Sequence, residues 1–127
     1  MFLIFILLLG TLTPELGGDA LCYQLNLPKV FLKAGSIAPD PLDYNSYFPL
    51  FMNNLYLVGL ATGGVFSAKL FNFVFGVLLV CCVYRELLRE TGNKPFSLFL
   101  CMVVLVTPAF YNMISTTYVD VGLSFYV

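Results

Sequence analysis

Two apolar runs of membrane-spanning length dominate the pattern of hydrophobic and polar positions along the chain. Residues 65–84, VFSAKLFNFVFGVLLVCCVY, carry one charge, and residues 95–114 form a second run of the same length. A helix needs about 20 apolar residues to cross the ~30 Å hydrocarbon core of a bilayer. Both runs are therefore predicted to be transmembrane helices, and Pro108 is either tolerated in the second helix or kinks it.

The two ends of the chain are shorter apolar runs. Residues 1–14 would reach only about 20 Å as a helix, and residues 118–127 begin a further apolar run. A signal peptide is the alternative for residues 1–14, but it needs a positively charged start, and no basic residue precedes Lys29. We expect a transmembrane helix at 1–14 whose beginning is missing, the start of another helix at 118–127, and a chain that is a fragment of a longer protein.

Residues 15–64 are the most polar part, and we expect an external loop with interfacial helices there. Residues 19–34 are predicted to form a helix, because Asp19 follows two glycines as an N-cap and Gly35 is a good helix stop. Pro28 should kink this helix or divide it in two. A helix with such a broad apolar side lies along the membrane surface.

Residues 38–64 complete the predicted external loop. Three prolines with Asp and Asn mark residues 38–49 as irregular. Residues 50–62 are apolar but too short to span, and Asn53 and Asn54 interrupt them, so we expect a second surface-lying or half-inserted helix. The glycine pair at 63–64 should break the chain before the first full span.

Composition and charge agree with a membrane location and give an orientation. The chain is 60% hydrophobic and 10% charged, with a mean hydropathy of +0.91, whereas a soluble domain is about a quarter charged. The expected class is an all-α, multi-pass integral membrane protein, and no basic cluster suggests nucleic acid. Three of the six basic residues, Arg85, Arg89 and Lys94, fall in the connector 85–94. Positive loops stay in the cytoplasm, so residues 15–64 should face outside.

The residue types present narrow the possible chemistry. The chain has no histidine and no CxxC pair, which excludes a mixed Cys/His zinc site and a histidine base, so carboxylates are the candidates for acid–base work. The predicted topology puts Asp19 and Asp120 at the same outer boundary. An acid at membrane depth is a functional hypothesis by default. The alternatives are that Asp19 is only an N-cap, worth about 1 kcal/mol, and that Asp120 caps the next helix just outside the membrane.

Three lysines and a tyrosine are candidate ligand contacts. Lys69 lies five residues into the first predicted span, where it either snorkels to the interface or contacts a lipid phosphate. Lys29 and Lys33 share one face of the predicted surface helix and have the same two interpretations. Tyr23 either lines a sugar pocket or belongs to an interfacial aromatic belt.

The order of these segments resembles a known superfamily. An apolar helix precedes GGDALCYQLNLPKVFLKAGSI, followed by a loop ending in YFP, then LYLVGLATGGVFSAKLFNFVFGVL, VYRELLRE and TPAFYNMISTTYVDVGLSFYV. Over about residues 15–127 the chain is similar to the N-terminal part of the multi-pass membrane glycosyltransferases of the GT-C superfamily. The likeness is to the bacterial branch related to protein mannosyltransferases and the aminoarabinose transferase of lipid A.

The resemblance implies a function and assigns roles. A sugar would pass from a polyprenyl-phosphate donor to an acceptor hydroxyl at the outer face of the bacterial inner membrane. Asp19 would be the general base and Asp120 a secondary acid, while Lys29, Lys33 or Lys69 would contact the donor phosphate and Tyr23 the sugar. The expected partners are membrane lipids and the donor lipid, with the oligomeric state open.

The chain departs from the family pattern in ways that affect these expectations. Many members place a second acid beside the first, where this chain has Ala20, so we expect no cofactor and no metal bridging paired carboxylates. Members also carry many more spanning helices, so this chain alone is not expected to turn over substrate. The competing hypothesis is a small, non-enzymatic multi-pass membrane protein, such as a transporter piece or an assembly subunit.

Overall fold

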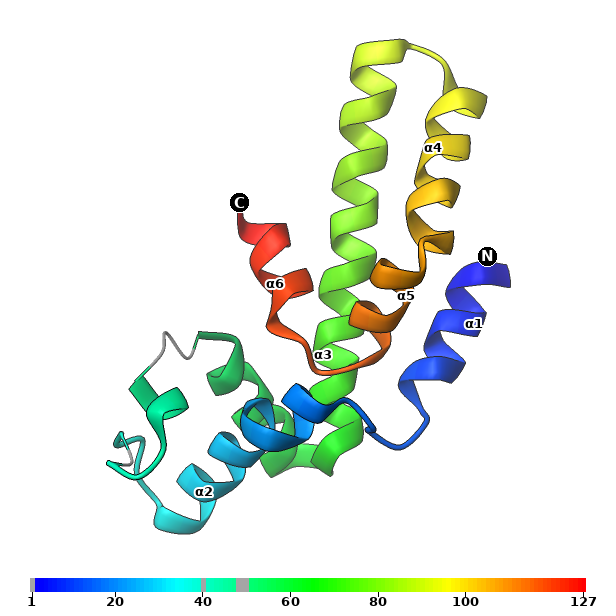
Figure 1. The fold of residues 1–127 in the computed structure, drawn as a ribbon. Helices are drawn as coiled ribbons and strands as arrows, with labels where there is room; N and C mark the ends of the chain where they lie inside the picture. The colour runs from blue at the N-terminus through cyan, green and yellow to red at the C-terminus, as the bar shows by residue number, and fades with distance from the viewer. Residues whose placement is uncertain (1, 40, 48–50) are drawn as a thin grey trace.

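The structure, a computed structural model, describes residues 2–39, 41–47 and 51–127, and every regular element in those ranges is a helix. The long helix α3 (Phe51–Thr91) forms the axis of the molecule, and α4 (Lys94–Val106) runs back beside its far half (Figure 1). The remaining helices gather around the other half of α3. The all-α prediction is confirmed. The predicted loop positions 40 and 48–50 lie outside the described residues.

Helix α3 consists of two arms that fold back on each other. Gly63 (φ −155°, ψ 18°) and Gly64 (φ 73°, ψ −158°) leave the helical conformation, and the positive φ of Gly64 suits a residue without a Cβ. In one straight helix residues 59 and 68 would lie about 13 Å apart. A Cβ added at Gly59 would instead lie 2.7 Å from the Ala68 nitrogen. The predicted break at 63–64 is therefore confirmed, and it makes a tight helical hairpin of residues 51–62 and 65–91.

Within the described residues, α3 is the single helix long and apolar enough to cross a membrane. In its most apolar window of 18 residues, only 22% are buried inside the molecule, so most of this surface is left for lipid or other helices. The long arm, residues 65–91, measures about 40 Å at 1.5 Å per residue.

The expected span at 95–114 is broken into two helices. Helix α4 ends at Val106, and α5 (Pro108–Ser115) leaves it at an angle of 69°. Proline cannot donate the helical hydrogen bond to residue 104, and the Val104 carbonyl accepts from the Thr107 amide instead. Of the two alternatives for Pro108, the kink is the one observed.

Both terminal helices are short and pack against the bundle. Helix α1 (Phe2–Thr11) has ten residues, about 15 Å, which does not cross a bilayer by itself. It lies beside α5, whereas α6 (Val119–Tyr126) packs on α3 (Figure 1). Leu7, Leu105 and Ile114 form a buried cluster where α1, α4 and α5 meet.

The predicted helix at 19–34 is divided, as expected near Pro28. A π-helical turn, η1 (Ala20–Gln24), leads into α2 (Asn26–Ala34), and Gly35 ends α2 with φ 66°. Because Pro28 has no amide hydrogen, the Gln24 carbonyl four residues earlier lacks its helical donor. It accepts a hydrogen bond of 3.2 Å from Asn53 Nδ2 on α3. The proline thus creates the acceptor that attaches this segment to the short arm of α3.

The predicted connector 85–94 is mostly helical. Helix α3 continues to Thr91, so only Gly92 and Asn93 form the turn into α4, where Asn93 Oδ1 caps the helix by accepting from the Phe96 amide at 3.2 Å. Arg85, Arg89 and Lys94 lie at this end of α3. The turn at 63–64 and the loop that follows α1 lie at the opposite end (Figure 1).

Candidate functional site

Buried polar side chains tie three segments together at the end of the molecule opposite the basic turn. Asn72 Nδ2 donates to the carbonyls of Met113 (2.7 Å) and Thr116 (2.6 Å). The Tyr56 hydroxyl donates to the Tyr118 carbonyl at 3.1 Å. Carbonyls at the end of a helix have no helical donors, so α3 side chains satisfy the end of α5 and fix the turn that leads to α6.

Glu15 fastens the loop after α1 to the same turn. Its side chain is buried, and Oε1 accepts from the amides of Leu16 (3.1 Å) and Gly17 (3.0 Å). Oε2 accepts from the Thr117 amide at 3.1 Å and from the Thr117 hydroxyl at 3.5 Å. One carboxylate therefore holds residues that are far apart in the chain in a fixed relation.

Lys69 takes part in this arrangement from inside the molecule. It is 1% exposed, and its Nζ donates to the Thr13 carbonyl at 2.7 Å. The ammonium therefore turns inward to the loop after α1 and does not snorkel to the interface, which was one of its two predicted roles. Lys69 also lines a cavity of about 220 Å³ together with Glu15.

The two predicted catalytic acids belong to segments that Glu15 holds together, since it accepts from Gly17, two residues before Asp19, and from Thr117, three residues before Asp120. The backbone of Gly17 lies against the Tyr118 ring, whose Cε2 would be 3.6 Å from a Cβ at that glycine. Burial raises the pKa of the Tyr118 phenol, and nearby groups raise it further, in this order: Asp19, Glu15, Tyr23 and Asp120. Asp19 and Asp120 are thus both among the charged groups that act on this phenol. Both carboxylates are exposed.

Asp19 stands at the predicted N-cap position, directly before η1, but its side chain does not cap the helix. Its backbone is already helical (φ −65°, ψ −37°), and its side chain makes no capping hydrogen bond, because a cap requires an extended backbone that turns the side chain toward the first amides. Asp120 lies in the first turn of α6, where the helix dipole favours a carboxylate. Neither acid is therefore engaged as a cap of its own helix.

The other predicted ligand contacts divide into two groups. Tyr23 is half-buried, its hydroxyl accepts from Gln24 Nε2 at 3.4 Å, and it belongs to the groups that act on Tyr118. Lys29 and Lys33 are exposed on α2, and no contact among the described residues joins them to the two acids. Over the described part of the chain, no group of three or more His, Cys, Asp or Glu could hold a metal ion.

Sequence reasoning missed the residues that build this site from within. Asn72 and Tyr56 hold the turn after α5, and Glu15 holds the loop before Asp19. A polar side chain in the middle of an apolar span is a recognisable signal, and Asn72 carries it. Glu15 gave no comparable signal, because Thr117, its partner outside its own loop, follows more than a hundred residues later in the chain.

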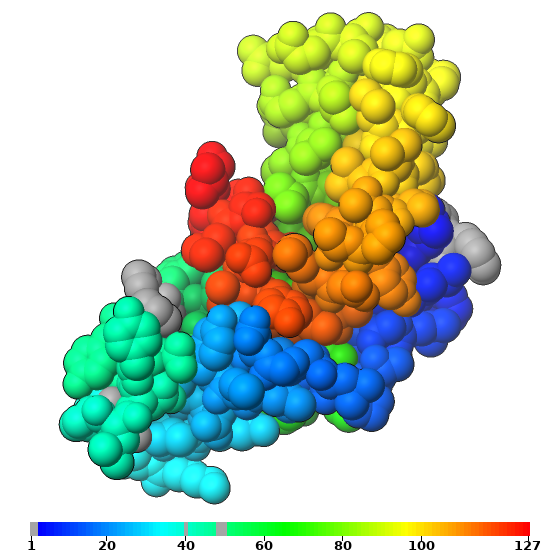
Figure 2. All heavy atoms as spheres, viewed as in Figure 1, coloured from blue at the N-terminus to red at the C-terminus, as the bar shows by residue number. Residues whose placement is uncertain are grey.

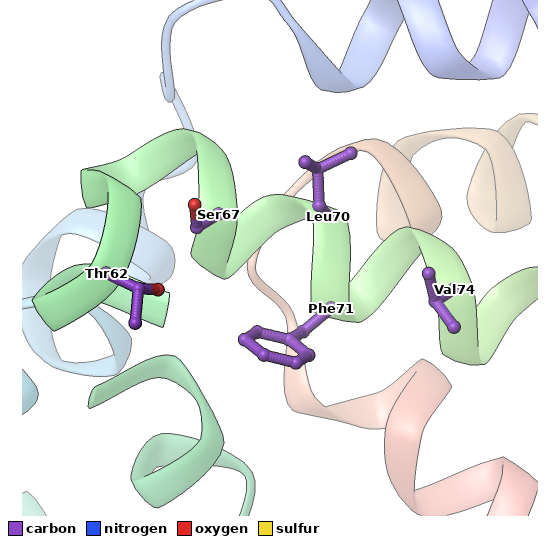
Figure 3. Close-up of a pocket in the computed structure, with 5 residues that line it drawn as sticks. All are labelled: Thr62, Ser67, Leu70, Phe71 and Val74. Carbon is purple, nitrogen blue, oxygen red and sulfur yellow. The ribbon is translucent and has the colours of Figure 1, made fainter. Parts of the chain in front are cut away.

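A second hollow, of about 260 Å³, lies beside the hairpin turn of α3 and contains no charged group. Thr62 lines it from the short arm and Ser67 from the long arm, with Leu70, Phe71 and Val74 (Figure 3). Figure 3 shows Leu70 and Phe71 pointing away from each other on the long arm. This hollow offers an apolar surface for packing and no acid–base chemistry.

Comparison with known proteins identifies no relative: no family model, no curated protein and no solved structure matches the chain.

Proposed function

We propose that the chain is part of a multi-pass membrane glycosyltransferase. It would transfer a sugar from a polyprenyl-phosphate donor to an acceptor hydroxyl at the outer face of the bacterial inner membrane. The observation that supports this function is that Glu15 joins Gly17, two residues before Asp19, to Thr117, three residues before Asp120, so that two exposed acids distant in the chain belong to segments held together. The sequence resemblance to GT-C glycosyltransferases assigns the base and the secondary acid to these same two residues.

The chemistry of glycosyl transfer can use such a pair of acids. The acceptor oxygen forms a bond to the anomeric carbon, the bond from that carbon to the donor phosphate breaks, and polyprenyl phosphate leaves with the electron pair. The acceptor proton needs a base, and Asp19, which is exposed and not engaged as a cap, supplies it. Asp120 stabilises the positive charge that develops on the sugar ring.

The surroundings of the two acids suit a lipid-linked donor. They lie at one end of a rod of apolar helices, whose exposed side chains offer a surface for the polyprenyl chain. Tyr23, half-buried in η1 four residues after Asp19, offers an aromatic ring for the sugar. Lys29 and Lys33, exposed on α2, are the proposed contacts of the donor phosphate, although no contact among the described residues joins them to the two acids.

The test is a transfer assay on membranes that express the gene from its natural locus. The donors are polyprenyl-phosphate mannose and polyprenyl-phosphate aminoarabinose, and the readout is released polyprenyl phosphate. Asp19→Asn should lower the rate about a hundredfold or more, because a general base contributes at least that factor. Glu90→Gln is the matched control, since this exposed acid lies at the opposite end of α3 and should leave the rate unchanged.

Two outcomes would contradict the proposal. Full transfer by Asp19→Asn would remove Asp19 from the mechanism. Absence of transfer from both donors by natural membranes that contain the folded protein would favour the non-enzymatic membrane protein instead.

A further inference from the structure

A polar cavity lies between the end of α1, the loop that follows it and α5. Its volume is about 220 Å³, and its walls include Glu15, Lys69, Tyr111 and Asn112. Helices α1 and α5, which form its two sides, lie next to each other on the face shown in Figure 2. The proposed transfer chemistry uses none of these four side chains.

The hydrogen-bond donors of Lys69 are only partly used, and Glu15 brings a negative charge to the same cavity. The Lys69 ammonium has three N–H donors, and a single hydrogen bond, to the Thr13 carbonyl, is formed. The Glu15 carboxylate already accepts four hydrogen bonds from the backbone and Thr117, which is about the capacity of its two oxygens. The ion pair found among the described residues joins Arg89 and Glu86 at the other end of the molecule.

Two neutral donors stand at the same cavity. The Tyr111 hydroxyl lies against Gly10 of α1, 3.3 Å from where a Cβ would be, and the Asn112 amide lines the wall beside it. Within the described part of the chain, neither side chain has a hydrogen-bond partner of its own. The cavity therefore offers the two unused N–H donors of a buried cation and two neutral donors, beside a carboxylate whose acceptor capacity is already filled, to a ligand rich in acceptor oxygens.

We propose that this cavity binds the phosphate group of a membrane lipid. A phosphate presents several charged oxygens and forms strong hydrogen bonds to an ammonium, and a buried cation gains more from such a partner than an exposed one does. The volume lies below the roughly 300–1,000 Å³ of drug-sized pockets, so it accommodates a headgroup and not a whole lipid. The lipid chains would lie along the apolar outer surface of α1, where Phe5 and Leu9 are exposed.

Two membrane lipids carry this chemistry, an ordinary anionic phospholipid and a polyprenyl phosphate. The inference does not depend on glycosyl transfer, because lipid binding needs neither Asp19 nor Asp120. If the polyprenyl lipid is the ligand, Lys69 supplies the cation at the leaving phosphate of the proposed reaction.

The test is native mass spectrometry of the full chain purified in detergent. The added lipids are phosphatidylglycerol, a polyprenyl phosphate and diacylglycerol, which has no phosphate. Both phosphate lipids should bind at least about tenfold more tightly than diacylglycerol, because the charged hydrogen bonds are missing in the latter. The tighter of the two identifies the source, and competition by inorganic phosphate would show that the phosphate is the recognised group.

Variants connect the binding to the cavity. Lys69→Met should weaken phosphatidylglycerol binding about tenfold or more, whereas Lys94→Met, at an exposed lysine at the opposite end of α3, should leave it unchanged. If Lys69→Met fails to fold, the double variant Tyr111→Phe, Asn112→Leu carries the test, since both side chains are exposed and bond to nothing else.

Binding of diacylglycerol as tightly as phosphatidylglycerol would overturn the inference. Equal phosphatidylglycerol binding by the wild type and a folded double variant would also overturn it. Asp19→Asn should keep its lipid binding whether or not it transfers sugar, so failure of the transferase proposal and failure of this one are distinguishable.

Discussion

At the scale of single residues, the buried carboxylate of Glu15 decides where Asp19 lies relative to Asp120. It accepts from two amides of its own loop and from the amide and hydroxyl of Thr117, three residues before Asp120. A glutamine at position 15 would have only one side-chain oxygen. Its NH₂ group would replace the other carboxylate oxygen and face N–H or O–H donors that now have an acceptor. We predict that Glu15→Gln lowers the free energy of unfolding by about 1–3 kcal/mol, measured by thermal unfolding in detergent.

The control for this prediction is Glu86→Gln. Glu86 is exposed and pairs with Arg89 at 3.8 Å. Exposed pairs of this kind contribute little to stability, so Glu86→Gln should lower the free energy of unfolding by no more than about 0.5 kcal/mol. Equal destabilisation by the two variants would show that Glu15 does not hold the loop and the turn together.

At the scale of elements, the sequence predicted most helices and breaks because they depend on local chemistry. The glycines at 63–64, the proline at 108 and Gly35 act within a few residues of themselves, and each stands at an observed break or helix end. Asp19 stands at the predicted N-cap position but makes no capping hydrogen bond, because capping depends on the backbone angles of that residue, which the neighbouring segments determine.

The candidate site was only partly predictable for the same reason. The alternation of spans, a property of the local pattern, predicts that the two acids lie at one membrane boundary, and this stays a prediction. Asn72 and Glu15 act through contacts with carbonyls and amides more than 40 residues away in the chain. No local pattern specifies such partners, so these residues emerge only when the segments are seen packed together.

The hairpin of α3 gives a prediction at the same scale. The arms approach so closely at Gly59 that a Cβ would lie 2.7 Å from the Ala68 nitrogen and 2.8 Å from its Cα. Backbone atoms cannot turn aside as a side chain can, so Gly59→Ala must push the arms apart. We expect a loss of about 1–3 kcal/mol in the free energy of unfolding, measured by chemical denaturation in detergent.

Gly18→Ala is the matched control for the hairpin prediction. It makes the same chemical change where nothing lies within 4 Å of the added Cβ, so it should leave stability unchanged or raise it slightly. A Gly59→Ala variant as stable as Gly18→Ala would mean that the arms are not in contact at this position.

At the scale of the whole molecule, the arrangement predicts which parts share one side of the membrane. Cys22 is exposed near Asp19, and the basic end of α3 should stay in the cytoplasm. In spheroplasts, a membrane-impermeant maleimide should label Cys22 when the other cysteines are replaced by alanine. It should also label Asp120→Cys in a cysteine-free chain. Glu90→Cys, at the basic end, should react only after permeabilisation, which serves as the control for sidedness. Labelling of Cys22 and Asp120→Cys from opposite sides would separate the two acids and remove the basis for a shared site.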